Sequence, residues 1–294
     1  MNVSSYLKLT AKNLADIPTA RLDALVLLED ATGKDRSWLL AHPELRITRS
    51  HLVKLNGWVE RRAGHEPLAY IRGKSEFYGR EFLVTPATLQ PRAETETMID
   101  LLKGSGFTGL RESVIVDVGS GSGCIAITAK LEFPEAKVYA TEINKDALII
   151  AKKNAKNLEA DVTFLQGNLL QPYWALSPGP SPLALLCNLP YVPNAHTINQ
   201  AAMQEPRVAI FGGEDGLDLY REMFEQIDKA SGFTGLRESV GKPKYIFTES
   251  LPFQHEKLAE IAEKHGYKFA VCTHKLVAFT VPYNFLNHFD FIEY

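Results

Sequence analysis

A tetrapeptide in the second half of the chain, Asn188-Leu189-Pro190-Tyr191, carries groups suited to hold a planar NH₂ group. The amide oxygen of Asn188 and a neighbouring main-chain carbonyl can both accept hydrogen bonds from such a group, and Tyr191 offers an aromatic face for stacking. The tetrapeptide follows LALLCN at 183–188, an apolar stretch that predicts a buried strand. Taken alone, it is also typical of a plain turn with Pro190 as its rigid corner.

A glycine-rich turn follows the apolar stretch SVIVDV at 113–118 and precedes a helical pattern. Its members are Gly119, Ser120, Gly121, Ser122 and Gly123. Glycine permits positive backbone angles and lets a ligand approach the main chain closely. A strand, a glycine-rich turn and a helix in this order indicate a nucleotide-binding device, although the pattern also fits dinucleotide enzymes.

Glu142 directly follows the next predicted strand, AKVYAT at 136–141. An acid after the second strand of such folds accepts hydrogen bonds from the hydroxyls of a ribose, so we expect Glu142 to do the same. The alternative is a structural role at the start of the following helix. Asn144 is the better candidate for that role, because Asn is a favoured helix N-cap.

The elements that must position these residues alternate between strand and helix. Predicted strands lie at 113–118, 136–141, 161–166, 183–188, 244–249, 267–272 and 275–281. Helices fit between most of them, for example from Cys124 to Phe133 and from Lys145 to Leu158. Such alternation predicts an α/β fold with a mostly parallel sheet and helices on both faces. Only Thr273 and His274 separate the last two strands, which should therefore be antiparallel neighbours.

The first ~70 residues contain no good strand, and their apolar residues recur at the spacing of helices. These residues are Leu22, Leu25, Leu27, Leu28, Trp38, Leu39, Leu40, Leu52, Leu55, Trp58 and Val59. A small helical bundle is predicted, with Asp35 or Ser37 at the start of its third helix and Thr48 or Ser50 at the start of its fourth. We expect a helical domain over 1–72, a hairpin linker over 73–90 and an α/β domain over 91–294.

Composition limits the class of protein. The 294 residues are 45% hydrophobic and 23% charged, which excludes a chain that is disordered as a whole. Thirty-two Lys and Arg against 35 Asp and Glu give a formal charge of −3, which argues against stable binding of nucleic acid through bulk electrostatics. No apolar run approaches the ~20 residues that span a bilayer, and the first residues lack the apolar core of a secretory signal. We expect a cytoplasmic protein without a membrane partner.

The three cysteines, Cys124, Cys187 and Cys272, lie singly in apolar surroundings. They form no CxxC pair and have no histidine at metal-ligand spacing, so we expect buried, reduced thiols and no metal site. One ten-residue segment, SGFTGLRESV, occurs twice, at 105–114 and at 231–240. Two copies do not make a solenoid, and we expect the segment to be a shared connector without a functional role.

The order of glycine turn, acid and NLPY resembles that of class I S-adenosylmethionine-dependent methyltransferases acting on planar nitrogens, whose loop reads (D/N)PPY. More narrowly, the chain resembles the HemK-type enzymes that methylate N5 of a glutamine in bacterial peptide-chain release factors. Five further segments carry this resemblance: Glu66–Ile71 with Gly73, Glu76–Gly79, Pro91–Glu96, Glu205–Arg207 and Gly212–Leu217. The sequence departs from the family pattern in Leu189 of the NLPY loop, in Asn168 where Asp is usual, and in Thr248-Glu249-Ser250 where the family has a turn containing glycine.

The resemblance implies a class I, Rossmann-like fold with a seven-stranded, mostly parallel sheet and one antiparallel strand. It implies that the turn at 119–123 lies under the methionine part of S-adenosylmethionine, that Glu142 holds the ribose, and that Asn168 and Leu169 flank the adenine. By the same resemblance, the loop at 188–191 holds the substrate glutamine, Asn188 also contacts the cofactor, and Asn188, Pro190 and Tyr191 serve catalysis. The helical N-terminal domain would help to hold the release factor, and we expect a monomer.

Three other functions remain open at this stage. A sister enzyme with the same loop methylates a glutamine of a ribosomal protein. A more distant possibility is methylation of adenine N6 in nucleic acid, against which the mild acidity of the chain argues. The third is a catalytically idle subunit that only binds the cofactor.

Overall fold

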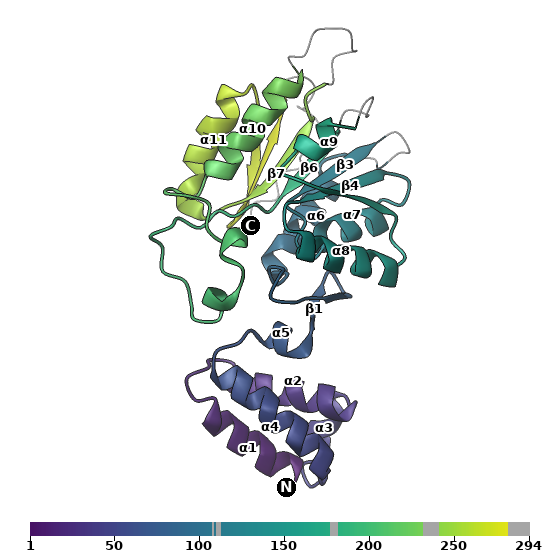
Figure 1. Ribbon diagram of the computed structural model, residues 1–294, viewed down its shortest axis with the longest axis vertical. Coiled ribbons are helices and arrows are strands. Elements are labelled where there is room, and N and C mark those ends of the chain that lie inside the picture. The colour runs from purple at the N-terminus through teal and green to yellow at the C-terminus, as the bar shows by residue number, and fades with distance from the viewer. Residues whose placement is uncertain (108, 110–112, 177–181, 232–240, 282–294) are drawn as a thin grey trace. The chain divides into compact units, whose positions relative to one another are not determined.

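The computed structural model describes residues 1–107, 109, 113–176, 182–231 and 241–281 (Figure 1). The chain divides into two compact units. One comprises Met1–Lys74 with Ile198–Glu205, and the other comprises Ser75–Thr197 with Pro206–Tyr294. None of the helices within the described ranges is long and apolar enough to cross a membrane.

The first unit is helical, as the apolar spacing predicts. Its helices are α1 (Val3–Asn13), α2 (Ala20–Thr32), α3 (Arg36–Ala41), α4 (Arg49–Ala63) and α5 (Leu68–Arg72), with a short 3₁₀ turn, η2 (Ala202–Gln204), from the later segment. Asp35 begins α3 and Thr48 begins α4, and each side chain accepts main-chain N–H groups of the first turn. Both predicted caps are thus confirmed. Leu27, Leu39 and Leu55 are fully buried between the helices.

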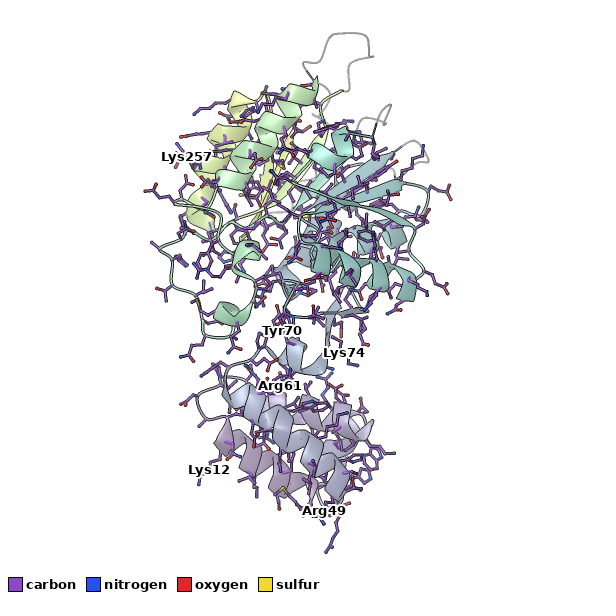
Figure 2. All side chains as sticks on the ribbon, in the orientation of Figure 1. Lys12, Arg49, Arg61, Tyr70, Lys74 and Lys257 are labelled. Carbon is purple, nitrogen blue, oxygen red and sulfur yellow. The ribbon has the colours of Figure 1, made fainter. Side chains whose placement is uncertain are left out.

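Two arginines of α4 connect the helical unit internally. Arg62 Nε lies 2.7 Å from the buried Asp23 of α2. Arg61, labelled in Figure 2, donates from Nε to Glu66 at 2.8 Å and lowers the pKa of that carboxyl. Glu66 is the first residue of one of the segments that carry the family resemblance. In the structure its carboxylate forms an ion pair with Arg61 inside the helical unit.

A hairpin of β1 (Lys74–Phe77) and β2 (Arg80–Leu83) begins at the junction between the two units. Tyr78 and Gly79 form its turn with φ of 52° and 70°, the conformation that favours glycine in two-residue hairpins. Asn154 of α8 accepts from Leu83 N at 2.7 Å and donates to Leu83 O at 2.9 Å, so the hairpin is bonded to the sheet-containing unit. The hairpin ends at Leu83, earlier than Gln90.

The second unit contains a seven-stranded sheet of order β5-β4-β3-β6-β7-β9-β8. Its strands are β3 (Val114–Val118), β4 (Lys137–Glu142), β5 (Val162–Gln166), β6 (Ala184–Cys187), β7 (Tyr245–Glu249), β8 (Lys268–Cys272) and β9 (Leu276–Thr280). All neighbours are parallel except that β9 runs antiparallel to both β7 and β8. The seven predicted strands and the single antiparallel strand are confirmed, and the antiparallel strand lies inside the sheet rather than at its edge.

Helices cover both faces of the sheet (Figure 1). Those of this unit are α6 (Thr97–Gly104), α7 (Cys124–Glu132), α8 (Lys145–Asn157), α9 (Gln171–Trp174), α10 (Asp218–Ser231) and α11 (His255–Lys264). Alternate strand residues point to opposite faces. Ile115 and Leu186 therefore pack with α6 and α7, whereas Val116 and Leu185 pack with α10 and α11.

The expectation that all three cysteines are buried is wrong for Cys272. Cys124 and Cys187 are buried, and burial raises the pKa of the Cys124 thiol to about 12. Cys272 is exposed because it is the last residue of β8, an edge strand that pairs with β9 on one side only and has no buried residue. Of the repeated segment SGFTGLRESV, most of the second copy, 232–240, lies outside the described residues, as do 108 and 110–112 of the first.

Candidate active site

A cavity of about 500 Å³ opens at the carboxyl ends of β3, β4, β5 and β6. This is the edge of an open α/β sheet at which ligands bind, and the volume is that of an ordinary small-molecule site. Most of the residues singled out in the sequence line it together: Gly119, Ser120, Gly121, Ser122, Glu142, Asn168, Leu169, Asn188, Leu189 and Pro190. Gly123 and Tyr191 lie beside the cavity without lining it.

Where the glycine turn lines the cavity, the glycines present main-chain atoms and no side chains. Gly119 and Gly121 have φ of 79° and 54°, a region that disfavours side chains. A Cβ added to Gly121 would meet nothing within 4 Å, whereas one added to Gly119 would lie 3.2 Å from Leu189. The turn therefore exposes its main chain to the cavity at Gly121.

Gly123 has a packing role instead. It is the N-cap of α7, with φ of 81°, and a Cβ there would press on Ala151 of α8 and Ile127 of α7 at 3.1 Å. The absence of a side chain allows the two helices to approach closely. Its assignment to cofactor binding stays a prediction.

Glu142 supports the glycine turn as well as lining the cavity. Its Oε2 accepts from Gly121 N and its Oε1 accepts from Asn144 N, both at 2.8 Å. Each carboxylate oxygen has a further lone pair to offer a ligand. Asn144 is the N-cap of α8, and its side chain accepts hydrogen bonds from Asp146 N and Ala147 N. The prediction that Asn144, rather than Glu142, caps this helix is therefore confirmed.

Two buried hydroxyls at the cavity indicate a polar ligand. Ser120 Oγ and Thr141 Oγ1 have no hydrogen-bond partner among the described residues, and both residues line the cavity. A buried polar atom without a partner is costly. A ligand bearing hydrogen-bonding groups would satisfy them.

The segment after β5 is held against α10. Asn168 Nδ2 donates to Glu222 Oε1 at 2.6 Å, which turns the amide nitrogen toward α10. Leu169 has a positive φ of 48°, unusual for a side chain of its size, and its side chain is buried. Ile143, which follows Glu142, lines the cavity with 63% of its surface exposed and was not predicted from the sequence.

Asp117 lies at the end of β3, fully buried behind the glycine turn. One carboxylate oxygen accepts from Ala126 N in the first turn of α7 at 3.0 Å, and the other has no partner among the residues described. Burial, reinforced by the charge of Glu142, raises the pKa of Asp117 to about 7.

Three residues of the NLPY loop are each tied to the protein interior. Asn188 Nδ2 donates to Thr95 Oγ1 at 3.1 Å. Leu189 is 2% exposed and lies in the same core cluster as Tyr220, whose hydroxyl donates to the main-chain oxygens of Cys187 and Glu249 at 3.1 and 2.6 Å. The Tyr191 hydroxyl donates to Glu249 Oε1 at 2.8 Å, so its ring is fixed rather than free to stack.

A strap over residues 210–217 backs the same loop. A Cβ on Gly212 would collide with the main-chain oxygen of Pro190, and one on Gly216 with that of Tyr191. Gln254 Nε2 donates to the main-chain oxygens of Tyr191 and Asp215, both at 2.7 Å. The GGEDGL segment thus requires glycine for close approach to the loop.

Sequence reasoning missed Thr95, Glu249 and Gln254 as partners of the loop. Thr95 lies in the segment PRAETE, which resembles the family pattern. Glu249 ends β7 and lies in Thr248-Glu249-Ser250, which departs from that pattern. A buried acid at the carboxyl end of a predicted strand was the available signal. What it contacts depends on strand order, which the sequence does not display.

A Rossmann-like sheet of this order, with a glycine turn after β3 and an acid after β4, defines a class I methyltransferase fold. In fold, the chain resembles the T. thermophilus 16S rRNA methyltransferase RsmC, solved with AdoMet and guanosine. The TM-score is 0.50 at 14% identity, over 71% of this chain and 49% of that one.

Family comparisons identify the chain more narrowly. Residues 5–73 match the PrmC N-terminal domain and residues 92–201 the methyltransferase small domain. A release factor glutamine methyltransferase of Koribacter versatilis is 41% identical over 216 residues, 72% of this chain and 76% of the relative. One of Coxiella burnetii is 36% identical over 269 residues, 91% and 90% of the two chains. The chain belongs to the release factor glutamine methyltransferase family, and the protein is a methyltransferase.

Proposed function

We propose that the protein transfers a methyl group from S-adenosylmethionine to N5 of the glutamine in the Gly-Gly-Gln loop of peptide-chain release factors. The observation that carries the proposal is the place of Asn188, Leu189 and Pro190 on the wall of the same cavity as the glycine turn. A group that can hold a planar amide thus lies next to a site for a nucleotide-like ligand. The names of the relatives give the substrate.

The residues around the cavity fit S-adenosylmethionine, which supplies an electrophilic methyl group when bound. The bare main chain at Gly121 leaves room for the methionine part. The hydroxyls of Ser120 and Thr141, which have no partner within the described ranges, would hydrogen-bond its polar groups. The Glu142 carboxylate would hold the ribose hydroxyls. The segment Asn168–Leu169 and the exposed face of Ile143 would flank the adenine.

A glutamine amide is a poor nucleophile because its nitrogen lone pair is delocalised into the carbonyl. Acceptors at Asn188 Oδ1 and the main-chain oxygen of Leu189 would orient the NH₂ group and stabilise the positive charge that grows on its nitrogen. The N-alkylated amide is strongly acidic, so its proton can pass to water without a strong base in the cavity. Pro190 keeps the loop stiff, and Tyr191 is anchored away from the cavity on Glu249.

We assign recognition of the release factor to the helical unit. The second unit contains the whole cavity lining, which leaves the helices at 1–72 without a part in the chemistry. We keep 73–90, which contains the hairpin, as the linker and 91–294 as the catalytic domain. The role of the helices at 1–72 in substrate choice would appear in KM for the release factor rather than in affinity for the cofactor.

Incubation with methyl-labelled S-adenosylmethionine tests the proposal. The substrates are a release factor, the same factor with the loop glutamine replaced by glutamate, ribosomal proteins and DNA. Label on the first alone is the expected result. Label on a ribosomal protein or on adenine would transfer the assignment to those substrates, and no label on any of them would indicate a subunit that only binds the cofactor.

A further inference from the structure

Four side chains from three distant segments form one hydrogen-bonded chain behind the NLPY loop. Asn188 Nδ2 donates to Thr95 Oγ1 at 3.1 Å, and Thr95 Oγ1 donates to Glu249 Oε2 at 2.6 Å. The other oxygen of Glu249 accepts from the Tyr191 hydroxyl at 2.8 Å. Thr95 belongs to the 3₁₀ turn η1 (Ala93–Glu96), and Glu249 ends β7. Thr95 and Glu249 are 2% and 1% exposed, so water cannot replace these contacts.

The direction of each bond follows from the number of protons available. Burial raises the pKa of Glu249, and the hydroxyls of Thr95 and Tyr191, which donate to its two oxygens, act in the opposite direction and favour the ionised form. An ionised carboxylate only accepts, so in that form Glu249 takes both hydroxyl protons. A threonine hydroxyl has one proton, and that of Thr95 is used on Glu249. The Thr95 oxygen can therefore only accept from Asn188, which must present its NH₂ group.

This fixes an otherwise ambiguous amide. An asparagine side chain can rotate by 180° and exchange its donor for its acceptor at little steric cost. With Nδ2 committed to Thr95, the carbonyl oxygen of Asn188 is the branch left for the cavity that Asn188 lines. The chain of bonds thus selects the acceptor that an NH₂ substrate requires.

We propose that Thr95 and Glu249 are positioning residues that lock Asn188 with its carbonyl oxygen toward the reacting amide, and that Glu249 simultaneously anchors Tyr191. The inference rests on the proposed function for its substrate. It adds two residues, Thr95, which also lines the cavity, and Glu249, which does not; both are proposed to act on the glutamine through Asn188. Their action is on the orientation of Asn188, so it affects the rate and not the binding of the cofactor.

Replacing Glu249 with glutamine separates the effect of its hydrogen-bonding pattern from the effect of its volume. A glutamine there keeps the volume of the glutamate but must donate through one of its two branches. Either Thr95 or Tyr191 would then face a donor where it now finds an acceptor. If Thr95 accepts from that donor, its own proton turns to Asn188, and the asparagine amide is driven to the reversed orientation.

Single-turnover methylation of a release factor by the full chain provides the test, with calorimetric binding of S-adenosylmethionine and thermal unfolding as companions. Thr95→Val should lower the rate about 10- to 100-fold with the cofactor affinity within about twofold. Thr95→Ser, which keeps the hydroxyl, should restore the rate to within about threefold. Glu249→Gln should lower the rate with the cofactor affinity kept, either by reversing the Asn188 amide or by removing the acceptor of Tyr191. The matched control is Thr128→Val, which removes a buried hydroxyl that has no partner in the described part of the chain.

A second readout does not depend on activity. In the wild-type protein the side-chain NH₂ of Asn188, assigned in amide NMR spectra by comparison with Asn188→Ala, should exchange slowly with water. It should lose this protection in Thr95→Val and keep it in Thr95→Ser and Thr128→Val. Wild-type protein that labels no release factor would overturn the proposed function, and the exchange data would still judge the bonded chain.

The positioning role is overturned by an unchanged rate in Thr95→Val. It is equally overturned if Thr95→Ser is as slow as Thr95→Val, or if rate, cofactor affinity and unfolding temperature all fall together, because a merely structural contact would do that. Unprotected Asn188 amide protons in the wild-type protein would remove its geometric basis.

Discussion

The main-chain N–H of Gly121 donates to Glu142 Oε2 at 2.8 Å, although 21 positions separate the two residues. The side chain assigned to the ribose therefore also holds the turn assigned to the methionine part of the cofactor. Loss of Glu142 would loosen the turn, and distortion of the turn would move Glu142. Substitutions at the two positions differ in what they remove, and they need separate controls.

Gly121→Val should abolish most binding of S-adenosylmethionine. The added side chain would project into open space on the cavity wall, where the cofactor is proposed to lie. Gly33→Val is the matched control, because Gly33 has a similar φ of 67° and open surroundings but belongs to the helical unit. Calorimetry should show at least a tenfold loss of affinity in the first variant alone. Equal affinities in the two variants would remove the turn from the site.

Glu142→Ala should weaken cofactor binding by about 10- to 100-fold, because the proposed charge-assisted hydrogen bonds to the ribose and the observed support of Gly121 would both be lost. Glu142→Gln keeps one acceptor and should fall between the wild-type protein and the alanine variant. Glu135→Ala, at an exposed position, serves as the control for loss of a surface carboxylate. Tight binding by Glu142→Ala would exclude the ribose assignment.

Asn188→Ala should retain cofactor affinity and lose about 10²- to 10³-fold in single-turnover rate on a release factor. The reason is that a directional acceptor at the reacting nitrogen is removed. The same variant on a release factor with a glutamate in place of the loop glutamine gives the background. A rate close to that of the wild-type protein would show that the loop serves other chemistry.

Leu189→Pro should destabilise the protein. From the sequence alone, a proline here would stiffen the loop and leave activity equal or modestly higher, through a loss of loop entropy worth roughly 0.4–1 kcal/mol. In the structure, however, Leu189 is 2% exposed and its side chain is part of the core cluster that contains Val118 and Tyr220. Loss of these buried contacts, about 1–3 kcal/mol, outweighs the entropic gain. Chemical denaturation measures the net change, and a more stable variant would contradict this ranking.

Asp117→Asn should become more stable relative to the wild-type protein as the pH rises. Burial raises the pKa of Asp117 from 3.8 to about 7, so the native state holds a proton that the unfolded state releases between these values. Stability from this group is therefore complete below about pH 4 and is lost as the pH rises through 7, whereas an asparagine loses none. Urea unfolding at pH 5, 6 and 7 should show the difference growing by about 1.4 kcal/mol per unit. A constant difference would mean that Asp117 is not perturbed.

Most helices and strands could be predicted from the local pattern of residue types along the chain. The inner strands β3, β4, β6, β7 and β9 follow apolar stretches that are mostly buried, and only the edge strands β5 and β8 have no buried residue. The caps Asp35, Thr48 and Asn144 bond main-chain groups within three positions of themselves. Such contacts depend on neighbours in the chain, so residue type and spacing are sufficient to predict them. The likeness of the NLPY loop and the glycine turn to known methyltransferases was visible for the same reason.

The sequence by itself therefore determined the element types, the family and the principal residues of the cavity wall. Tertiary structure alone decided which buried groups meet. Thr95 and Glu249 are 154 positions apart, and their contact exists because β6 and β7 are paired and η1 lies at the carboxyl ends of both. Strand order likewise put Cys272 on an exposed edge. Hydrogen bonds are short and directional, so they report the packing of distant segments, which no local pattern of residue types encodes.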